Sequence, residues 1–210
     1  MSVDIDGGGQ YTELLLVRHG KSTWNAEGRL QGQADPPLSS VGEQQARAVS
    51  SVLSRRPIAA VYCSPLLRAR ATANAIAAVH GLDPHLDHRL SEINLGAWQA
   101  HRVAELRSDT AVQYRKWLAD PRAIKPPHGE TLDEALARAA PAVQEMVANH
   151  AGHTIVLVTH SIIGRAILSD LLGVGTRLWA HLSLKQGLVS TVRFREGVAV
   201  LERLNAKAKP

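Results

Sequence analysis

The stretch Leu14-Leu15-Leu16-Val17-Arg18-His19-Gly20 decides the fold. Four consecutive apolar residues followed by a polar group are typical of a short strand that is buried on both faces of a parallel sheet. The strand is predicted over residues 13–18, and it ends in a loop that begins with His19-Gly20. In an open parallel sheet, ligands bind beyond the carboxyl ends of the strands. The sequence therefore predicts a binding site immediately after this strand.

Two further apolar runs have the same form. Ile58–Cys63 leads into Ser64-Pro65, and Thr154–Thr159 leads into His160-Ser161. Arg68 follows the first of these runs by one helical turn. If all three strands lie in parallel, their polar ends meet at one edge of the sheet. Two arginines, two histidines and two helix N-termini at one edge would form an anion site.

Helical patterns alternate with these strands. Ser39 is predicted to cap one helix, and Ser64 with Pro65 to open another that runs to His80. Further helices are predicted over residues 100–118, 131–149, with a kink or break at Pro141, and 160–172, and a late hairpin over 188–194 and 198–204. This order predicts an α/β fold, a three-layer α/β/α sandwich whose central sheet is mostly parallel with an antiparallel edge strand. We expect one domain over residues 1–210, with flexible ends at 1–10 and 206–210.

The composition excludes several classes of protein. The chain has 210 residues, 45% hydrophobic and 20% charged, which is ordinary for a globular domain and unlike a fibrous or disordered chain. No apolar run approaches the roughly 18 residues of a membrane helix, and the first ten residues lack the pattern of a secretory signal. The single cysteine, Cys63, fits a reducing cytoplasm. The net charge of +5 is scattered and only 4% of residues are aromatic, so a small anionic ligand is favoured over nucleic acid.

An ordered series of motifs resembles the histidine phosphatase superfamily, the phosphoglycerate mutase-like proteins. In chain order the matching motifs are Leu16–Asn25 (LVRHGKSTWN), Gln31-Gly32, Asp35, Pro37-Leu38-Ser39, Gly42, Ser64–Ala69, Thr72-Ala73, Glu92–Trp98, Gly129-Glu130-Thr131, and Val158–Ser161 followed by Arg165. An isolated Arg-His-Gly would be a weak signal, but this order of motifs along almost the whole chain is specific. The resemblance implies the phosphoglycerate mutase-like fold.

The resemblance also implies a metal-independent phosphatase that hydrolyses small phosphomonoesters through a phosphohistidine intermediate. His19 would be the nucleophile, with its other ring nitrogen held by a backbone carbonyl. Glu92 would protonate the leaving alkoxide and then accept a proton from the attacking water. The groups implied around the phosphoryl group are Arg18, Arg68 and His160 as charge-stabilising residues, with Asn25, Gln31, Gly32 and Ser161 as further binding residues. No metal and no cofactor are implied, and neither a nucleic acid nor a membrane is expected as a partner.

Some positions depart from the commonest family pattern. Lys21 and Gln99 each stand where the family often has Glu, and Ser161 stands where it often has Gly. None of these changes removes a group that is assigned to chemistry, so they bear on the choice of substrate. Selection of the substrate is expected from residues 100–127, which are predicted to roof the pocket. Candidates there are Arg102, Lys116, Arg122 and His128.

Two other functions stay open. One is a cofactor-dependent phosphoglycerate mutase, although Leu95-Gly96 stands where true mutases usually carry Tyr-Gly, and the longer basic insertion that follows there is missing. The other is a catalytically weak module on the same fold that binds a phospho-ligand or a partner. Such a module would be expected to have lost His19, Glu92 or an arginine, and none is lost. The sequence leaves open the natural substrate and whether the chain forms a homodimer.

Several residues also have simpler structural interpretations. Asn25 and Gln31 suit loop turns, and Glu130 is expected either to support the pocket or to cap the helix after it. The remaining histidines are interpreted as surface loop residues, since no carboxylate or cysteine accompanies them at metal-ligand spacing; the clusters are His80, His85 and His88, and His150 with His153.

Overall fold

A computed structural model describes residues 11–107 and 112–206, and the predicted flexible ends at 1–10 and 207–210 lie outside the described residues. Six strands form one sheet in the order β3-β2-β4-β1-β5-β6. They are β1 (Thr12–Arg18), β2 (Ile58–Cys63), β3 (His85–Leu86), β4 (Thr154–Thr159), β5 (Val189–Arg195) and β6 (Val198–Ala206). β1 pairs in parallel with β4 and antiparallel with β5, which confirms a mostly parallel sheet with an antiparallel hairpin at one edge. Ala206 was predicted to be flexible, but it ends β6 and pairs with Val189.

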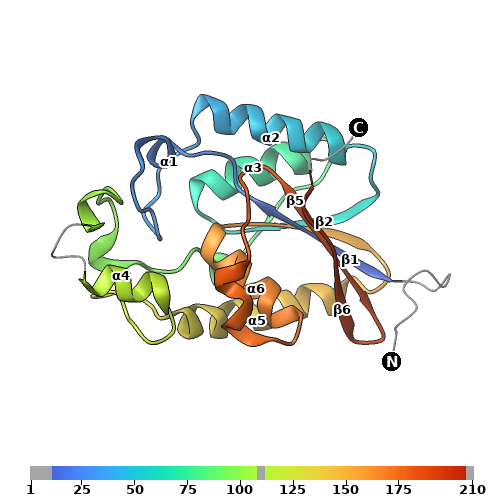
Figure 1. Cartoon of the computed structure of the whole chain (residues 1–210). Helices are drawn as coiled ribbons and strands as arrows, with labels where there is room; N and C mark the ends of the chain where they lie inside the picture. Colours follow the sequence, from blue (N-terminus) through green and yellow to red (C-terminus); the bar gives the residue numbers. More distant parts are fainter. Residues whose placement is uncertain (1–10, 108–111, 207–210) are drawn as a thin grey trace.

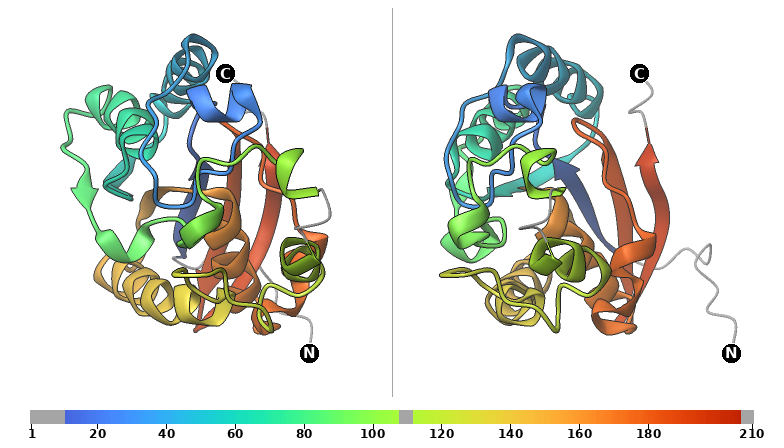
Figure 2. Two further views of the ribbon diagram at one scale, coloured as in Figure 1. Left: turned by 90° about the vertical axis from the view of Figure 1, so that its left-hand side faces the viewer. Right: turned by 60° about the vertical axis from the view of Figure 1, so that its left-hand side comes forward.

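Helices cover both faces of the sheet, as the predicted three-layer sandwich requires. Figure 1 shows α2 (Ser40–Leu53) and α3 (Leu67–Ala78) on one face, with α5 (Leu132–Asn149) and α6 (Ser161–Leu171) on the other. α5 runs through Pro141 without a break. The short α1 (Thr23–Glu27) and α4 (Val112–Ala119) lie at the end toward which β1 points, and Figure 2 looks onto that end. Within residues 11–107 and 112–206, no helix has the length and apolar character needed to cross a membrane.

The apolar run of β1 is buried on both sides because its side chains alternate between two cores. Leu14 and Leu16 pack in the core that α5 and α6 cover, and Leu15 and Val17 pack in the core that includes residues of α2 and α3. All four side chains are at most 1% exposed. Because helices cover both faces of the sheet at β1, a charged side chain anywhere in this run would have no route to water.

Helix α3 does not begin where the sequence predicted. Its first residue is Leu67 and its N-cap is Leu66, whose side chain makes no capping hydrogen bond. Instead the Leu67 N–H donates to Asp35 Oδ1 at 2.6 Å. The prediction of a Ser64 cap with Pro65 in the first turn was wrong because a distant carboxylate takes that role.

The predicted helix over residues 100–118 was also wrong in its first half. Ala100 has a φ of +70°, which a helix does not allow, and the described helix α4 begins only at Val112. The backbone near Ala100 pairs instead with the loop after α1: Ala100 N donates to Leu30 O and Val103 N to Gly28 O, both at 2.9 Å. Tertiary hydrogen bonds therefore override the local helix propensity, and they tie the predicted roof to the loop beside the candidate site.

The loop after β1 is held close to α2 by a pair of glycines. A Cβ on Gly20 would lie 2.4 Å from the Gly42 carbonyl oxygen, and one on Gly42 would lie 2.0 Å from the Lys21 oxygen. The Gly20 N–H donates to Thr72 Oγ1 of α3 at 3.1 Å. The chain that follows His19 is therefore fixed against two helices.

Candidate active site

The register of β1 and β4 brings two histidines together at the carboxyl edge of the sheet. Arg18 is paired with Thr159, and the His19 N–H donates to the Thr159 carbonyl at 3.0 Å. The next residues, His19 and His160, consequently lie side by side, with ring centroids 5.1 Å apart. Both side chains are buried. The convergence that the strand ends predicted is therefore present.

Backbone contacts and burial together define the state of His19. Its Nδ1 lies 2.7 Å from its neighbour's carbonyl, Gly20 O, so Nδ1 carries the proton and donates. Burial, followed by the charges of Arg68 and Arg18, holds the pKa of His19 well below 6.5. The ring is therefore neutral at pH 7, and its Nε2 has a lone pair that is free to attack an electrophile.

Arg68 is a fully buried cation on the first turn of α3, only 1% exposed. Its Nη1 donates to Ala34 O and its Nη2 to Gly32 O, each at 2.7 Å. Burial lowers its pKa to about 10, an effect opposed by the charge of Glu92, so it stays protonated at neutral pH. A guanidinium that is held by two carbonyls in this way is presented in one orientation.

The half-buried Arg18 and the fully buried His160 complete the group of side chains around His19. Arg18 Nη1 donates to Leu184 O at 2.6 Å. Burial is the main cause that lowers the pKa of both Arg18 and His160, the latter well below 6.5. Arg18 Nε, Arg68 Nε and both ring nitrogens of His160 are buried and have no hydrogen-bond partner among the described residues. Buried polar atoms of this kind favour a ligand that accepts hydrogen bonds, such as a phosphate.

Glu92 reaches the site from the segment between β3 and α4, and it is 6% exposed. Its Oε1 accepts from Ile163 N at 2.9 Å and from Ile93 N at 3.0 Å, and its Oε2 accepts from Ile162 N at 3.0 Å. Ile162 and Ile163 belong to the first turn of α6, directly after His160. The carboxyl group is therefore fixed at a helix N-terminus beside the histidine pair.

Asn25 and Gln31 both contact Ser22, a fully buried side chain that the sequence interpretation missed. Ser22 Oγ lies 2.8 Å from Gln31 Oε1 and 3.1 Å from Asn25 Oδ1, and Asn25 closes the capping box of α1. The Asn25 side-chain oxygen accepts hydrogen bonds in the cap, which leaves the amide nitrogen as the group that can donate to a phosphate. The interpretation of Asn25 and Gln31 as residues that stabilise the loop is confirmed.

Gly32 and Gln99 shape the loop that holds Arg68. The φ of Gly32 is +52°, and a Cβ there would lie 2.4 Å from Gln99 Oε1. That oxygen accepts from Gln33 N at 2.6 Å. Gln99 thus holds the turn at residues 32–34 in place. One of the positions that depart from the family pattern therefore has a structural role.

The remaining predicted residues lie at the margin. Ser161 begins α6, and its carbonyl accepts from Arg165 Nε at 3.1 Å. The four residues proposed in the roof are exposed: Arg102, Lys116, Arg122 and His128. Arg122 pairs with Asp133 at 3.5 Å. Across the described ranges, no three His, Cys, Asp or Glu side chains are grouped so as to hold a metal ion.

Arg138 and Glu130 support Glu92. The sequence did not single out Arg138, and it left open whether Glu130 supports the pocket or caps a helix. Arg138 of α5 donates to backbone carbonyls around Glu92 and pairs with Glu130, while the cap of α5 is Thr131 with Glu134 rather than Glu130. A signal for Arg138 exists in the sequence: it falls within the apolar stripe of α5, next to Ala135, Ala139 and Ala142. A charged residue in such a stripe indicates a buried partner.

The buried histidines should make stability depend on pH. In the unfolded chain His19 and His160 take up protons near pH 6.5, whereas burial keeps both neutral in the folded chain. The unfolded state then binds more protons, so the free energy of unfolding falls as the pH drops below about 6.5. The loss is up to about 1.4 kcal/mol per pH unit for each histidine. Urea unfolding at about pH 7.5 and about pH 5.5 measures it, and His160→Gln is expected to reduce the difference; an unchanged difference would contradict the assignment.

Known proteins share this arrangement of strands and helices. The model of the "Histidine phosphatase superfamily (branch 1)" matches residues 14–207. Phosphoserine phosphatase 1 of Hydrogenobacter thermophilus is 33% identical over 193 residues, 92% of each chain. A protein of Photorhabdus laumondii named "Probable phosphoglycerate mutase" is 33% identical over 183 residues, 87% of this chain and 85% of its own. The mycobacterial glucosyl-3-phosphoglycerate phosphatase in complex with VO3 superposes with a TM-score of 0.85 at 30% identity, over 92% of this chain and 99% of its own. A match of this length, with these relatives over most of both chains, makes the protein a member of the histidine phosphatase superfamily.

Proposed function

We propose that the protein hydrolyses small phosphomonoesters, without a metal, through a phosphohistidine on His19. The observation that carries the proposal is the buried group at the carboxyl edge of the sheet. Neutral His19 lies beside His160, and in the same site the Nε–H groups of Arg18 and Arg68 are buried without an acceptor among the described residues. A phosphoryl group would satisfy these donors. The family also contains relatives that are named phosphatases.

The first step transfers the phosphoryl group to the enzyme. The Nε2 of His19 attacks phosphorus in line, a P–N bond forms and the P–O bond to the alcohol breaks. Glu92 gives its proton to the departing oxygen, so that a neutral alcohol leaves. Arg18, Arg68 and His160 donate to the equatorial oxygens and stabilise the charge that develops there.

The second step returns the enzyme to its starting state. A water molecule attacks phosphorus, the P–N bond breaks, and Glu92, now a carboxylate, accepts the proton of the water. The positive charge that a metal would supply comes from Arg18 and Arg68, which the pocket already holds in place. Asn25 adds a donor through its amide nitrogen, and Gln31, Gly32 and Ser161 shape the surrounding loop and helix end.

One specific observation keeps the mutase as a second candidate, since a relative named as a mutase is as similar as the phosphatase. A mutase must hold its phosphohistidine away from water. Leu95-Gly96 and the short segment after it favour hydrolysis, as set out above. The free, buried Cys63 supports a reducing compartment such as the cytoplasm as the location that we propose.

The proposal is tested by measuring phosphate release from a panel of esters in the presence of a chelator. The panel takes its members from the names of the relatives: phosphoserine, 3-phosphoglycerate and glucosyl-3-phosphoglycerate, with p-nitrophenyl phosphate as a general substrate. We expect release that the chelator does not reduce. Conversion of 3-phosphoglycerate into 2-phosphoglycerate without release would favour the mutase, and loss of release with chelator would contradict the metal-independent scheme.

A further inference from the structure

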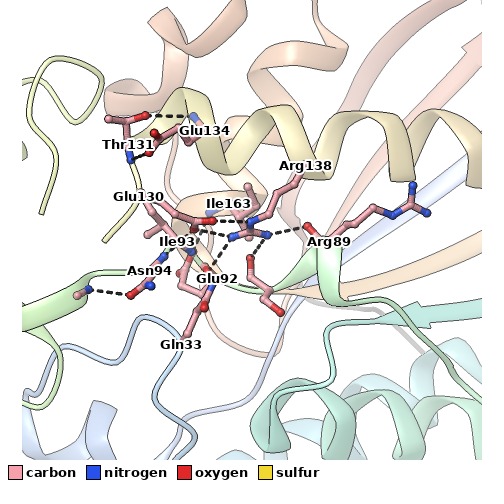
Figure 3. A network of polar contacts seen from close by, with 12 residues as sticks. Gln33, Arg89, Glu92, Ile93, Asn94, Glu130, Thr131, Glu134, Arg138 and Ile163 are labelled. Atoms are coloured by element: carbon pink, nitrogen blue, oxygen red, sulfur yellow. Dashed lines mark hydrogen bonds and ion pairs between the residues drawn. The ribbon is translucent and has the colours of Figure 1, made fainter. Parts of the chain in front are cut away.

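Arg138 of α5 donates hydrogen bonds to the backbone around Glu92 (Figure 3). Its Nη1 donates to Arg89 O at 2.7 Å and to Ser91 O at 2.8 Å, and its Nη2 donates to Glu92 O at 2.9 Å. The side chain comes from the middle of α5, and it is only 21% exposed. One guanidinium thus joins three carbonyls of a segment that has no regular strand or long helix to hold it.

Glu130 fixes the orientation of that guanidinium. Its two carboxylate oxygens accept from Arg138 Nε and Nη2, each at 3.0 Å, and Oε2 also accepts from Asn94 N at 2.9 Å. Such two-pronged pairing holds a guanidinium plane in one direction, which a lysine cannot do. The Arg138–Glu130 pair therefore holds the segment 89–94 at two places. Arg138 binds carbonyls at or before Glu92, and Glu130 binds the N–H of Asn94.

The Glu92 side chain is anchored independently of Arg138. Its carboxyl group accepts from Ile162 N and Ile163 N of α6, as described above, while its backbone carbonyl accepts from Arg138 and from Gln33 Nε2 at 3.1 Å. Glu92 consequently spans the distance between α5, which holds its backbone, and α6, which carries His160. The position of its carboxyl oxygens relative to His19 depends on both anchors.

We propose that Arg138, oriented by Glu130, is a positioning residue for the proton donor Glu92. The inference rests on the proposed function, because it needs Glu92 to act on the leaving group. Arg138 touches neither substrate nor reacting atoms in this scheme. Its effect is to keep the Glu92 backbone where the carboxyl group reaches the departing oxygen, since a small displacement of a catalytic group sharply lowers the rate.

The choice of leaving group separates this role from a merely structural one. The p-nitrophenolate ion leaves without needing a proton, whereas the alkoxide of glycerol 2-phosphate needs one. We expect Arg138→Met and Arg138→Lys to lower kcat on glycerol 2-phosphate by about 100-fold, and on p-nitrophenyl phosphate by less than about 5-fold. Adding Arg138→Met to Glu92→Gln should then cause little further loss, because the group that Arg138 positions is already disabled.

Arg89→Met is the matched control. Arg89 also ties this segment to α5, through Glu145, and it pairs with Asp87 of its own segment; among the described residues its side-chain hydrogen bonds go to these two carboxylates and to no carbonyl near Glu92. We expect it to leave both rates within about 2-fold of wild type. Glu130→Gln keeps an acceptor and removes the charge, so it should show the same selectivity as Arg138→Lys to a smaller degree. If Arg138→Met fails to fold, Arg138→Lys and Glu130→Gln provide the test.

The outcomes distinguish the two proposals. A selective loss on glycerol 2-phosphate in Arg138→Lys or Glu130→Gln supports the positioning role. An equal loss on both esters in these variants, with wild type active on both, overturns that role and leaves the phosphatase proposal standing. A wild-type protein that hydrolyses neither ester overturns the proposed function, and the positioning role with it.

Discussion

Replacing His19 with alanine is expected to lower kcat by about 10⁴-fold or more on every phosphomonoester that the wild-type protein hydrolyses. The reason is that the change removes the only atom that bonds to phosphorus in the proposed first step. The cations Arg18 and Arg68 and the neutral His160 remain, but they only stabilise charge. Loss of the nucleophile should therefore affect activated and unactivated esters alike, in contrast to the loss of a proton donor.

The same variant has a direct chemical readout. Wild type mixed with a ³²P-labelled ester and stopped in base should retain label as an alkali-stable, acid-labile phosphohistidine, and His19→Ala should retain none. His88→Ala, at an exposed histidine of a short 3-10 helix, is the control and should label as wild type does. A melting transition like that of wild type shows that the variant is folded. Activity within about tenfold of wild type would sink the assignment of His19 as nucleophile.

The second large effect is expected from Glu92→Gln, and it should depend on the leaving group. For alkyl esters such as phosphoserine, whose alkoxide needs a proton, we expect kcat to fall by about 10³-fold. For p-nitrophenyl phosphate, the first step needs no proton, so the fall should be limited to the role of Glu92 in activating water, about tenfold. Rates on both esters, measured for the same preparation of each variant, give the comparison.

Stability has to be measured beside these rates. Glutamine places an NH₂ group where one carboxylate oxygen now accepts a backbone N–H, so one of the three bonds from Ile93, Ile162 and Ile163 is lost. Loss of that bond costs about 1–3 kcal/mol, which lowers the melting temperature without choosing between esters. Equal losses of kcat on both esters would mean that Glu92 holds the end of α6 in place and does not act on the leaving group.

Much of the fold was predictable from the sequence because its central strands have a distinctive sequence pattern. β2 and β4 lie at the predicted residues, and β1 begins one residue earlier than predicted. Apolar runs of this length, each ending in a polar group, have few alternatives to a buried parallel strand. The convergence of His19 and His160 followed from the same pattern, since the ends of neighbouring parallel strands share one edge.

The parts that escaped prediction depend on partners far away in the chain. The start of α3 is set by Asp35, and the course of residues 100–103 by hydrogen bonds to the loop at 28–30. Local propensity carries no information on such contacts. For Arg138 the apolar stripe of α5 signals that the side chain has a buried partner, but the partners themselves are carbonyls 46 to 49 positions earlier, which no motif displays.

The place of β1 at the centre of the sheet has a consequence for the synthesis of the protein. Leu14 pairs with Ile155 on one side and Val192 on the other, so its first partner leaves the ribosome about 140 residues later. At about 5–20 residues per second, that interval is on the order of 10 s. Throughout it, a strand with four consecutive apolar residues has both edges unpaired, which is the condition that favours aggregation or capture by a chaperone. The nascent chain is therefore most vulnerable before β4 emerges, and the proposed phosphate site, which needs His160 after β4, can assemble only then.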